Sequence, residues 1–178
     1  MKNIIMIRPE LPQDLPAIHY VNKQAFGREK EAILVDTFRQ NGALTMSLVA
    51  VRGNEIVGHV AFSPVTIEPP DGNIKAITLA PIAVPPPYQR QGIGSLLMQT
   101  SVKECRKQGY DLIVLVGHPE YYPRFGFVRA NTKGLRCEFE EVPDEAWMVL
   151  ELRQDILTGD KRTVKFRQEI RDSVADGF

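Results

Sequence analysis

The spacing of apolar positions changes along the chain from a helical period to a period of two. This change predicts two helices followed by a sheet. A short strand over residues 4–8 comes first. Asp14, a residue type typical of an N-cap, then precedes apolar positions at helical spacing, and a second helical pattern runs over 28–40. Asn41-Gly42 supplies a left-handed stop after it. We therefore expect both helices to precede the main part of the sheet.

From residue 45 the apolar period becomes two, which predicts antiparallel strands. Residues 45–67 contain two apolar runs separated by a turn at 52–55. Asp71-Gly72 forms a second turn, and a third strand follows over 74–84. Pro81 lies inside this third strand and has no N–H to donate, so the hydrogen-bonded ladder should break there.

The next segments predict a parallel pair. Residues 93–108 have a helical pattern, and 111–117 is a continuous apolar run, typical of a strand buried on both faces. A strand, a helix and a strand in this order form a right-handed crossover. Strands from Phe127 and over 147–152 complete an α/β (α+β) mixed sheet that is mainly antiparallel, with helices on both faces.

The domain prediction is one domain over 1–152 and a C-terminal extension over 153–178. The extension is polar and charged, and residues 163–166 are predicted to form one extra strand. Three roles are open for it: covering a pocket, joining a homodimer or remaining a mobile tail.

Composition excludes several classes of protein. The chain of 178 residues carries 22 Lys and Arg against 22 Asp and Glu, so it lacks the basic excess of a protein that binds nucleic acid through phosphates. Its longest apolar stretches, such as 112–116, fall far short of the roughly 20 residues of a membrane span, and no export signal is visible. We therefore expect a cytoplasmic protein. Cys105 and Cys137 match neither a metal-site nor a disulfide pattern, so no metal is expected.

The most informative stretch is the loop over 84–95, between a strand and the best helix. The first N–H groups of a helix lack intrahelical partners, and Gly92 and Gly94 let a phosphate approach the backbone. A plain turn with glycines placed for geometry is the alternative. The Walker pattern fails at Ser95-Leu96, and the dinucleotide fingerprint fails at Leu97 and Asp111.

Three spaced motifs resemble the GNAT superfamily of acyl-CoA-dependent N-acetyltransferases, and in particular a subgroup of uncharacterised bacterial members. The first is Gln89-x-x-Gly92-x-Gly94, the signature of the family. The others are 80–84 before this loop and 117–127 after the next strand. The resemblance covers about residues 4–152. It implies the GNAT fold, with one parallel pair of strands that splay apart.

The resemblance also implies acetyl-CoA as the acyl donor and assigns its contacts. The loop clamps the diphosphate of coenzyme A through Gln89 and through five backbone amides. The strand end before the loop pairs with the pantetheine arm. The amides are those of Arg90, Gln91, Gly92, Gly94 and Ser95, and the strand end is Ile82, Ala83 and Val84.

Acetyl transfer to an amine requires a proton for the departing thiolate. The spacing Tyr-x-x-x-Gly-Phe of the family assigns this role to Tyr122, with Tyr121 in reserve; the alternative is that both rings only pack beneath the sheet. His118, His59 and water remain open as the base. The acceptor pocket is expected from the first two helices and the last strands, near residues such as Phe26, Arg28, Phe38, Trp147 and Met148.

Three functions follow from these patterns. The first is an N-acetyltransferase that passes the acetyl group to a primary amine in a ternary complex. The amine belongs to a small molecule or to a protein or peptide. The sequence leaves open whether the donor carries an acetyl group or a longer acyl group. The second is a non-catalytic acyl-CoA-binding module for sensing or assembly. The third is a phosphate-loop domain for ATP or NAD.

Overall fold

The computed structural model describes residues 4–175 and 177. The chain forms two compact units. Unit 1 comprises Met1–Ser63, Ala80–Ser101 and Gln168–Phe178, and unit 2 comprises Pro64–Leu79 and Val102–Arg167. Strand β5 (Ala76–Ala83) and helix α3 (Ile93–Lys107) each continue from one unit into the other. The larger sheet has the strand order β1-β2-β3-β5-β6-β9-β7.

Three antiparallel strands form the sheet of unit 1: β1 (Ile5–Pro9), β2 (Met46–Arg52) and β3 (Glu55–Pro64). Ile7 pairs with Ala50, and Leu48 pairs with Val60. A tight turn joins β2 to β3, and Gly53 adopts the positive φ of 61° that this turn requires. These strands and their turn confirm the prediction from the alternating pattern.

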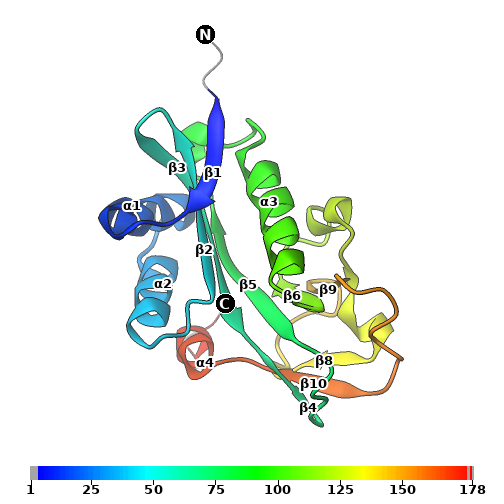
Figure 1. The fold of residues 1–178 in the computed structure, drawn as a ribbon. Coiled ribbons are helices and arrows are strands. Elements are labelled where there is room, and N and C mark those ends of the chain that lie inside the picture. Colours follow the sequence, from blue (N-terminus) through cyan, green and yellow to red (C-terminus); the bar gives the residue numbers. More distant parts are fainter. Residues whose placement is uncertain (1–3, 176, 178) are drawn as a thin grey trace. The chain divides into compact units, whose positions relative to one another are not determined.

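Helices cover both faces of this sheet. Helices α1 (Leu15–Phe26) and α2 (Lys30–Gln40) lie side by side in Figure 1. They share a buried cluster with β2 and β3 that consists of Ile18, Val35, Val49 and Ala61. On β3, His59 bonds to α1, whereas its neighbour Gly58 faces Ile93 and Leu97 of α3. Because neighbouring strand residues point to opposite faces, α1 and α3 lie on opposite faces of β3.

Asp14 occupies the N-cap position of α1, as predicted, but its side chain makes no capping hydrogen bond to this helix. A short 3-10 helix, η1 (Pro12–Asp14), precedes α1 and turns the carboxylate back toward the preceding chain. There it accepts the Leu11 N–H at 2.7 Å and two hydrogen bonds from the Arg8 guanidinium at 2.6 and 3.1 Å. The side chain thus fixes the link between β1 and α1.

The larger sheet continues in unit 2 with β6 (Leu112–Val116), β9 (Trp147–Glu151) and β7 (Val128–Arg129). Strands β5 and β6 are parallel, and their recorded pairs run from Ala76–Leu112 to Thr78–Val114. Beyond Thr78 this ladder stops, although β5 reaches Ala83 and β6 reaches Val116. The splayed parallel pair is therefore present, and it parts ahead of Pro81.

A smaller sheet in unit 2 has the order β4 (Thr66–Glu68), β10 (Arg162–Lys165) and β8 (Leu135–Cys137). Strand β10 is antiparallel to β4 and parallel to β8. The extra strand predicted in the C-terminal extension is present as β10. The sequence did not predict that residues 66–68 leave the main sheet for this one.

Helix α4 (Gln168–Val174) of unit 1 was also not predicted. It packs against the end of α2, where the Asn41 side-chain amide donates to Glu169 at 3.1 Å.

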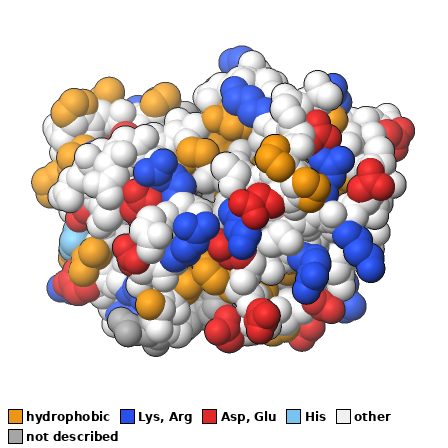
Figure 2. Space-filling model, turned by 90° about the horizontal axis from the view of Figure 1, so that it is seen from below, with side chains coloured by type: hydrophobic (Ala, Val, Ile, Leu, Met, Phe, Trp, Pro, Cys, Tyr) orange, Lys and Arg blue, Asp and Glu red, His pale blue; other side chains and the backbone are white. Residues whose placement is uncertain are grey.

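Charges of both signs are interspersed on the face seen in Figure 2, which agrees with a net charge of zero. No helix within residues 4–175 is long and apolar enough to cross a membrane.

Candidate functional site

The loop between β5 and α3 exposes a row of backbone donors. It begins with the 3-10 helix η2 (Pro86–Tyr88), and Arg90 and Gly92 then adopt positive φ angles of 60° and 83°. The first bond of α3 runs from the Leu96 N–H to the Gly92 carbonyl at 3.0 Å. Within the described chain, the N–H groups of residues 90–95 donate to no protein acceptor. These donors are therefore available to a ligand.

Two glutamine side chains stabilise the loop from within. The Gln89 amide donates to the Val84 carbonyl at 2.8 Å, and the Gln91 amide donates to the Pro87 carbonyl at 3.1 Å. The Gln89 amide donor thus closes the loop, and the contact of Gln89 with the coenzyme stays a prediction. Val84, expected to pair with the pantetheine arm, has its carbonyl occupied by this bond.

The end of β5 leads directly into the loop. Ala83 is buried at 1% exposure, whereas Ile82 and Val84 on either side of it are half-buried. This alternation turns Ile82 and Val84 toward the opposite face of the strand from Ala83.

The loop has the chemistry that a diphosphate requires. Free N–H groups at the start of α3 coincide with the positive end of its helix dipole, which favours an anion. A Cβ added at Gly92 would meet no protein atom within 4 Å, so the space beside this residue is open. The signature residues thus fit an anionic group of coenzyme A.

Tyr122 lies in unit 2, at the start of the 3-10 helix η3 (Tyr122–Phe125). Its ring is buried, with 7% exposure, and packs edge-on against Phe127 at a centroid distance of 5.9 Å. Gly117, at the end of β6, allows this position: a Cβ there would collide with Cε2 of the ring and lie 3.0 Å from Cδ2.

The two adjacent tyrosines have different environments. The rings of Tyr121 and Tyr122 are nearly perpendicular, with an interplanar angle of 85°. Tyr121 is half-buried and lies under the Arg124 guanidinium, which is 4.9 Å from the ring centroid. Burial, and to a lesser extent Tyr121, raises the pKa of Tyr122 above its usual value. The Tyr122 hydroxyl therefore keeps its proton well into the alkaline range.

His59 is fully buried on β3 and has structural partners. Asn22 Nδ2 donates to its Nδ1 at 3.0 Å, so the proton of the neutral ring lies on Nε2, which bonds to Ser47 Oγ at 2.8 Å. Burial, with a smaller contribution from Arg39, lowers the pKa of His59 to about 3. His118, the other candidate base, is exposed and follows β6.

Residues expected near the acceptor are partly core residues. Phe38 is fully buried in unit 1. Trp147, in unit 2, is 2% exposed and donates through Nε1 to the Leu135 carbonyl at 3.1 Å. Both side chains stabilise the fold. In the part of the chain that is described, no three His, Cys, Asp or Glu side chains gather as a metal site.

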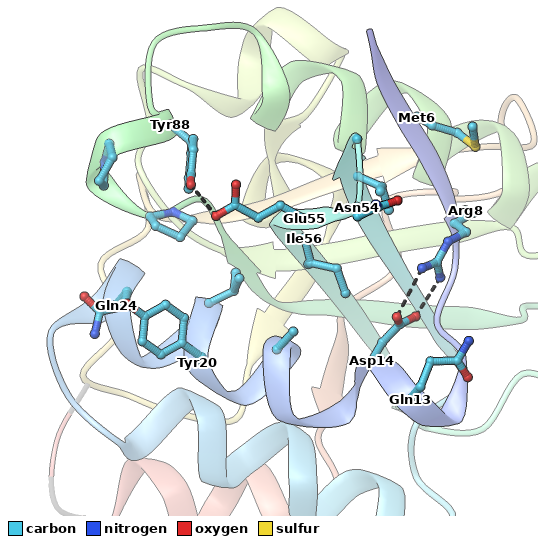
Figure 3. A pocket seen from close by; sticks show the side chains of 16 residues that line it. Met6, Arg8, Gln13, Asp14, Tyr20, Gln24, Asn54, Glu55, Ile56 and Tyr88 are labelled. Atoms are coloured by element: carbon cyan, nitrogen blue, oxygen red, sulfur yellow. Dashed lines mark hydrogen bonds and ion pairs between the residues drawn. The ribbon is translucent and has the colours of Figure 1, made fainter. Parts of the chain in front are cut away.

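Unit 1 also contains a cavity of about 800 Å³ (Figure 3). It is lined by β1, α1, the turn between β2 and β3, and the first part of the loop. Its charged groups are paired: the Arg8 guanidinium binds Asp14, and the Tyr88 hydroxyl donates to Glu55 at 2.5 Å. Sequence reasoning did not find this cavity, because its walls come from four separate segments.

The comparisons with known proteins agree on one family. A model of the acetyltransferase (GNAT) domain matches residues 6–130. The Escherichia coli (strain K12) protein YhbS, an uncharacterized N-acetyltransferase, is 34% identical over 165 residues, which are 92% of this chain and 97% of YhbS. YjhQ of the same strain, also an uncharacterized N-acetyltransferase, is 33% identical over 151 residues, or 82% of this chain and 83% of YjhQ.

Two solved structures extend this similarity. The E. coli YhbS structure in complex with CoA has a TM-score of 0.88 and 33% identity, and the match covers 94% of this chain and 92% of that one. A GNAT family acetyltransferase from Brucella melitensis in complex with acetyl-CoA has a TM-score of 0.76 and 32% identity, with 94% and 99% covered.

Proposed function

We propose, from the premise that this chain belongs to the GNAT acetyltransferase family, that it transfers an acetyl group from acetyl-CoA to a primary amine in a ternary complex. The observation that supports this most directly is the row of free N–H groups over 90–95 at the start of α3. The E. coli and B. melitensis relatives were solved with CoA and acetyl-CoA.

In this proposal the loop binds the diphosphate through the amides of Arg90, Gln91, Gly92, Gly94 and Ser95. Backbone groups at the end of β5 hold the pantetheine arm where the parallel ladder has ended. Acetyl-CoA supplies the activated thioester. The loop acts by binding and orienting it, so that the amine meets the carbonyl carbon in the correct geometry.

Tyr122 is the proposed acid. When the amine displaces the thiolate, the Tyr122 hydroxyl gives its proton to the departing sulfur, and the resulting tyrosinate recovers a proton from water before the next turnover. Its raised pKa keeps this proton in place at the alkaline pH where an amine acceptor is neutral. His59 cannot serve as the base in its present environment, because it is buried and bonded at both ring nitrogens. The proton lost by the amine therefore passes to water or to His118.

Binding and chemistry are tested separately. Thermal shift with CoA, ATP and NAD asks which ligand stabilises the fold, and we expect a rise in Tm with CoA alone. A shift with ATP or NAD instead would favour a different phosphate-loop domain. A screen of small amines and amine-bearing peptides with acetyl-CoA, scored by released thiol, then identifies an acceptor.

The acid is tested by Tyr122→Phe, with Tyr121→Phe as the matched control. A general acid contributes about 10²- to 10⁴-fold, so we expect kcat of Tyr122→Phe to fall by at least about 100-fold while Kd for CoA is unchanged. A loss confined to Tyr121→Phe would transfer the role to that residue. CoA binding without turnover on any amine would favour a sensing or assembly module. A parallel His118→Gln variant distinguishes this histidine from water as the base.

A further inference from the structure

Side chains from the turn between β2 and β3 hold the loop that precedes α3. On the turn side are Arg52 and Glu55, and on the loop side are Tyr88 and Gln91. Arg52 Nη2 donates to Gln91 Oε1 at 2.7 Å, and the Tyr88 hydroxyl donates to Glu55 Oε1 at 2.5 Å. Figure 3 shows the second of these bonds at the edge of the cavity. We call these four residues the turn brace.

The two bonds of the turn brace support each other. The Arg52 guanidinium carbon lies 5.6 Å from the centroid of the Tyr88 ring, close enough for a cation–π interaction. The bond to Glu55 raises the pKa of Tyr88, which keeps the hydroxyl protonated as a donor. Gln91 also donates to the Pro87 carbonyl within the loop, so the Arg52 bond extends a network that already links residues 87 and 91.

The loop needs such support because of its backbone. Arg90 is a non-glycine residue at φ 60°, a conformation that surrounding contacts must stabilise. The free N–H groups follow at once, over 90–95. A loop held in its binding conformation loses less conformational entropy when a ligand arrives. The turn brace ends at Gln91, whose own backbone N–H is one of these donors.

We propose that Arg52 and Glu55 are positioning residues that pre-organise the loop for the diphosphate of coenzyme A without touching it. This inference rests on the proposed function. It assigns a role to two side chains that lie outside the signature motif, on a different part of the chain. One net hydrogen bond corresponds to a change of about 3- to 10-fold in affinity, which sets the expected effect of each variant.

The sign of the Glu55 effect distinguishes positioning from simple electrostatics. Removing a negative charge close to an anion site should tighten anion binding if charge alone acts. Positioning predicts the opposite: Glu55→Ala weakens CoA binding by about 3- to 10-fold. Glu55→Gln keeps an acceptor for the Tyr88 hydroxyl and should restore most of the affinity.

The experiment measures Kd for CoA by isothermal titration, together with kcat and KM for acetyl-CoA. The variants are Glu55→Ala, Glu55→Gln, Arg52→Ala and Tyr88→Phe. The control is Lys107→Ala, which removes an exposed pair with Glu104 in the last part of α3. We expect a higher Kd and KM for Glu55→Ala, Arg52→Ala and Tyr88→Phe, with kcat within about twofold of the native value and Tm no lower than in the control.

Each outcome decides the question. Unchanged affinity in Arg52→Ala and Glu55→Ala, or tighter binding in Glu55→Ala, overturns the inference while leaving the proposed function intact. A loss of Tm beyond that of the control, with no rescue by Glu55→Gln, assigns the turn brace to folding and also overturns it. If the native protein does not bind CoA, the proposed function fails, and the inference fails with it.

Discussion

His59 should make the protein less stable in mild acid. Its ring is fully buried and neutral, with the pKa lowered to about 3, whereas a histidine in the unfolded chain titrates near 6.5. Between these values the unfolded chain binds a proton that the folded chain excludes. The free energy of unfolding therefore falls as the pH falls through this window, and the contribution of His59 is fully present only above about pH 6.5.

The magnitude follows from the linkage of one proton. Each pH unit inside the window removes about 1.4 kcal/mol, so lowering the pH from 6.5 to 5 removes about 2 kcal/mol. Against a total stability of about 5–15 kcal/mol, this loss is easily measured. The upper part of the window is the best place to look, because carboxylates begin to titrate below about pH 5.

Urea unfolding at pH 7, 6.5, 6, 5.5 and 5 measures the effect. His59→Gln should lower the free energy of unfolding at every pH. Between pH 6.5 and 5, the slope of this free energy against pH should be smaller in the variant than in the native protein by about 1.4 kcal/mol per pH unit. His118→Gln, at an exposed position, is the control for a His-to-Gln substitution that leaves the core intact. Equal slopes for the native protein and His59→Gln would refute the assignment of His59 as a buried neutral ring.

Four further outcomes are expected. Gly117→Ala pushes against the Tyr122 ring and should lower kcat while Kd for CoA holds; unchanged kcat contradicts the proposed role of that ring. Gly58→Ala overpacks the contact with α3 and should cost about 1–3 kcal/mol in urea unfolding, unlike a substitution into open space. Cys105, with a pKa raised to about 12 by burial, should react with a thiol reagent only after denaturation. The carboxylates of Asp36 and Glu29 raise the pKa of His19. The charged ring should therefore stabilise the native protein by under about 1 kcal/mol below pH 6.5, and this contribution should be lost as the pH rises above that value. His19→Gln should lack this contribution at every pH.

The sequence predicted those parts of the fold that local patterns determine. The alternation over 45–64 and the apolar run at 112–116 are direct consequences of which faces are buried, so their strands could be found without a structure. The glycine signature likewise located the loop, because free amides at a helix start depend only on neighbouring residues.

Long-range partners were not predictable in this way. Asp14 lies at the predicted N-cap position of α1, but its carboxylate binds Arg8 and the Leu11 N–H and does not bond to that helix, since the position of β1 brings the Arg8 cation near. Residues 66 and 67 were assigned to the main sheet, because nothing in their own sequence identifies β10 as their partner. The bond from Arg52 to Gln91 joins residues 39 positions apart, and neither residue type signals the other.

The small sheet has a consequence for the order of assembly during translation. Its middle strand, β10, is made after both of the strands that flank it. Until residues 162–165 leave the ribosome, β4 and β8 each have an edge with unpaired backbone N–H and C=O groups, which other nascent chains can pair with. Unit 2 cannot be completed before that point. A product cut at residue 152 would keep those two edges permanently and should be prone to aggregation.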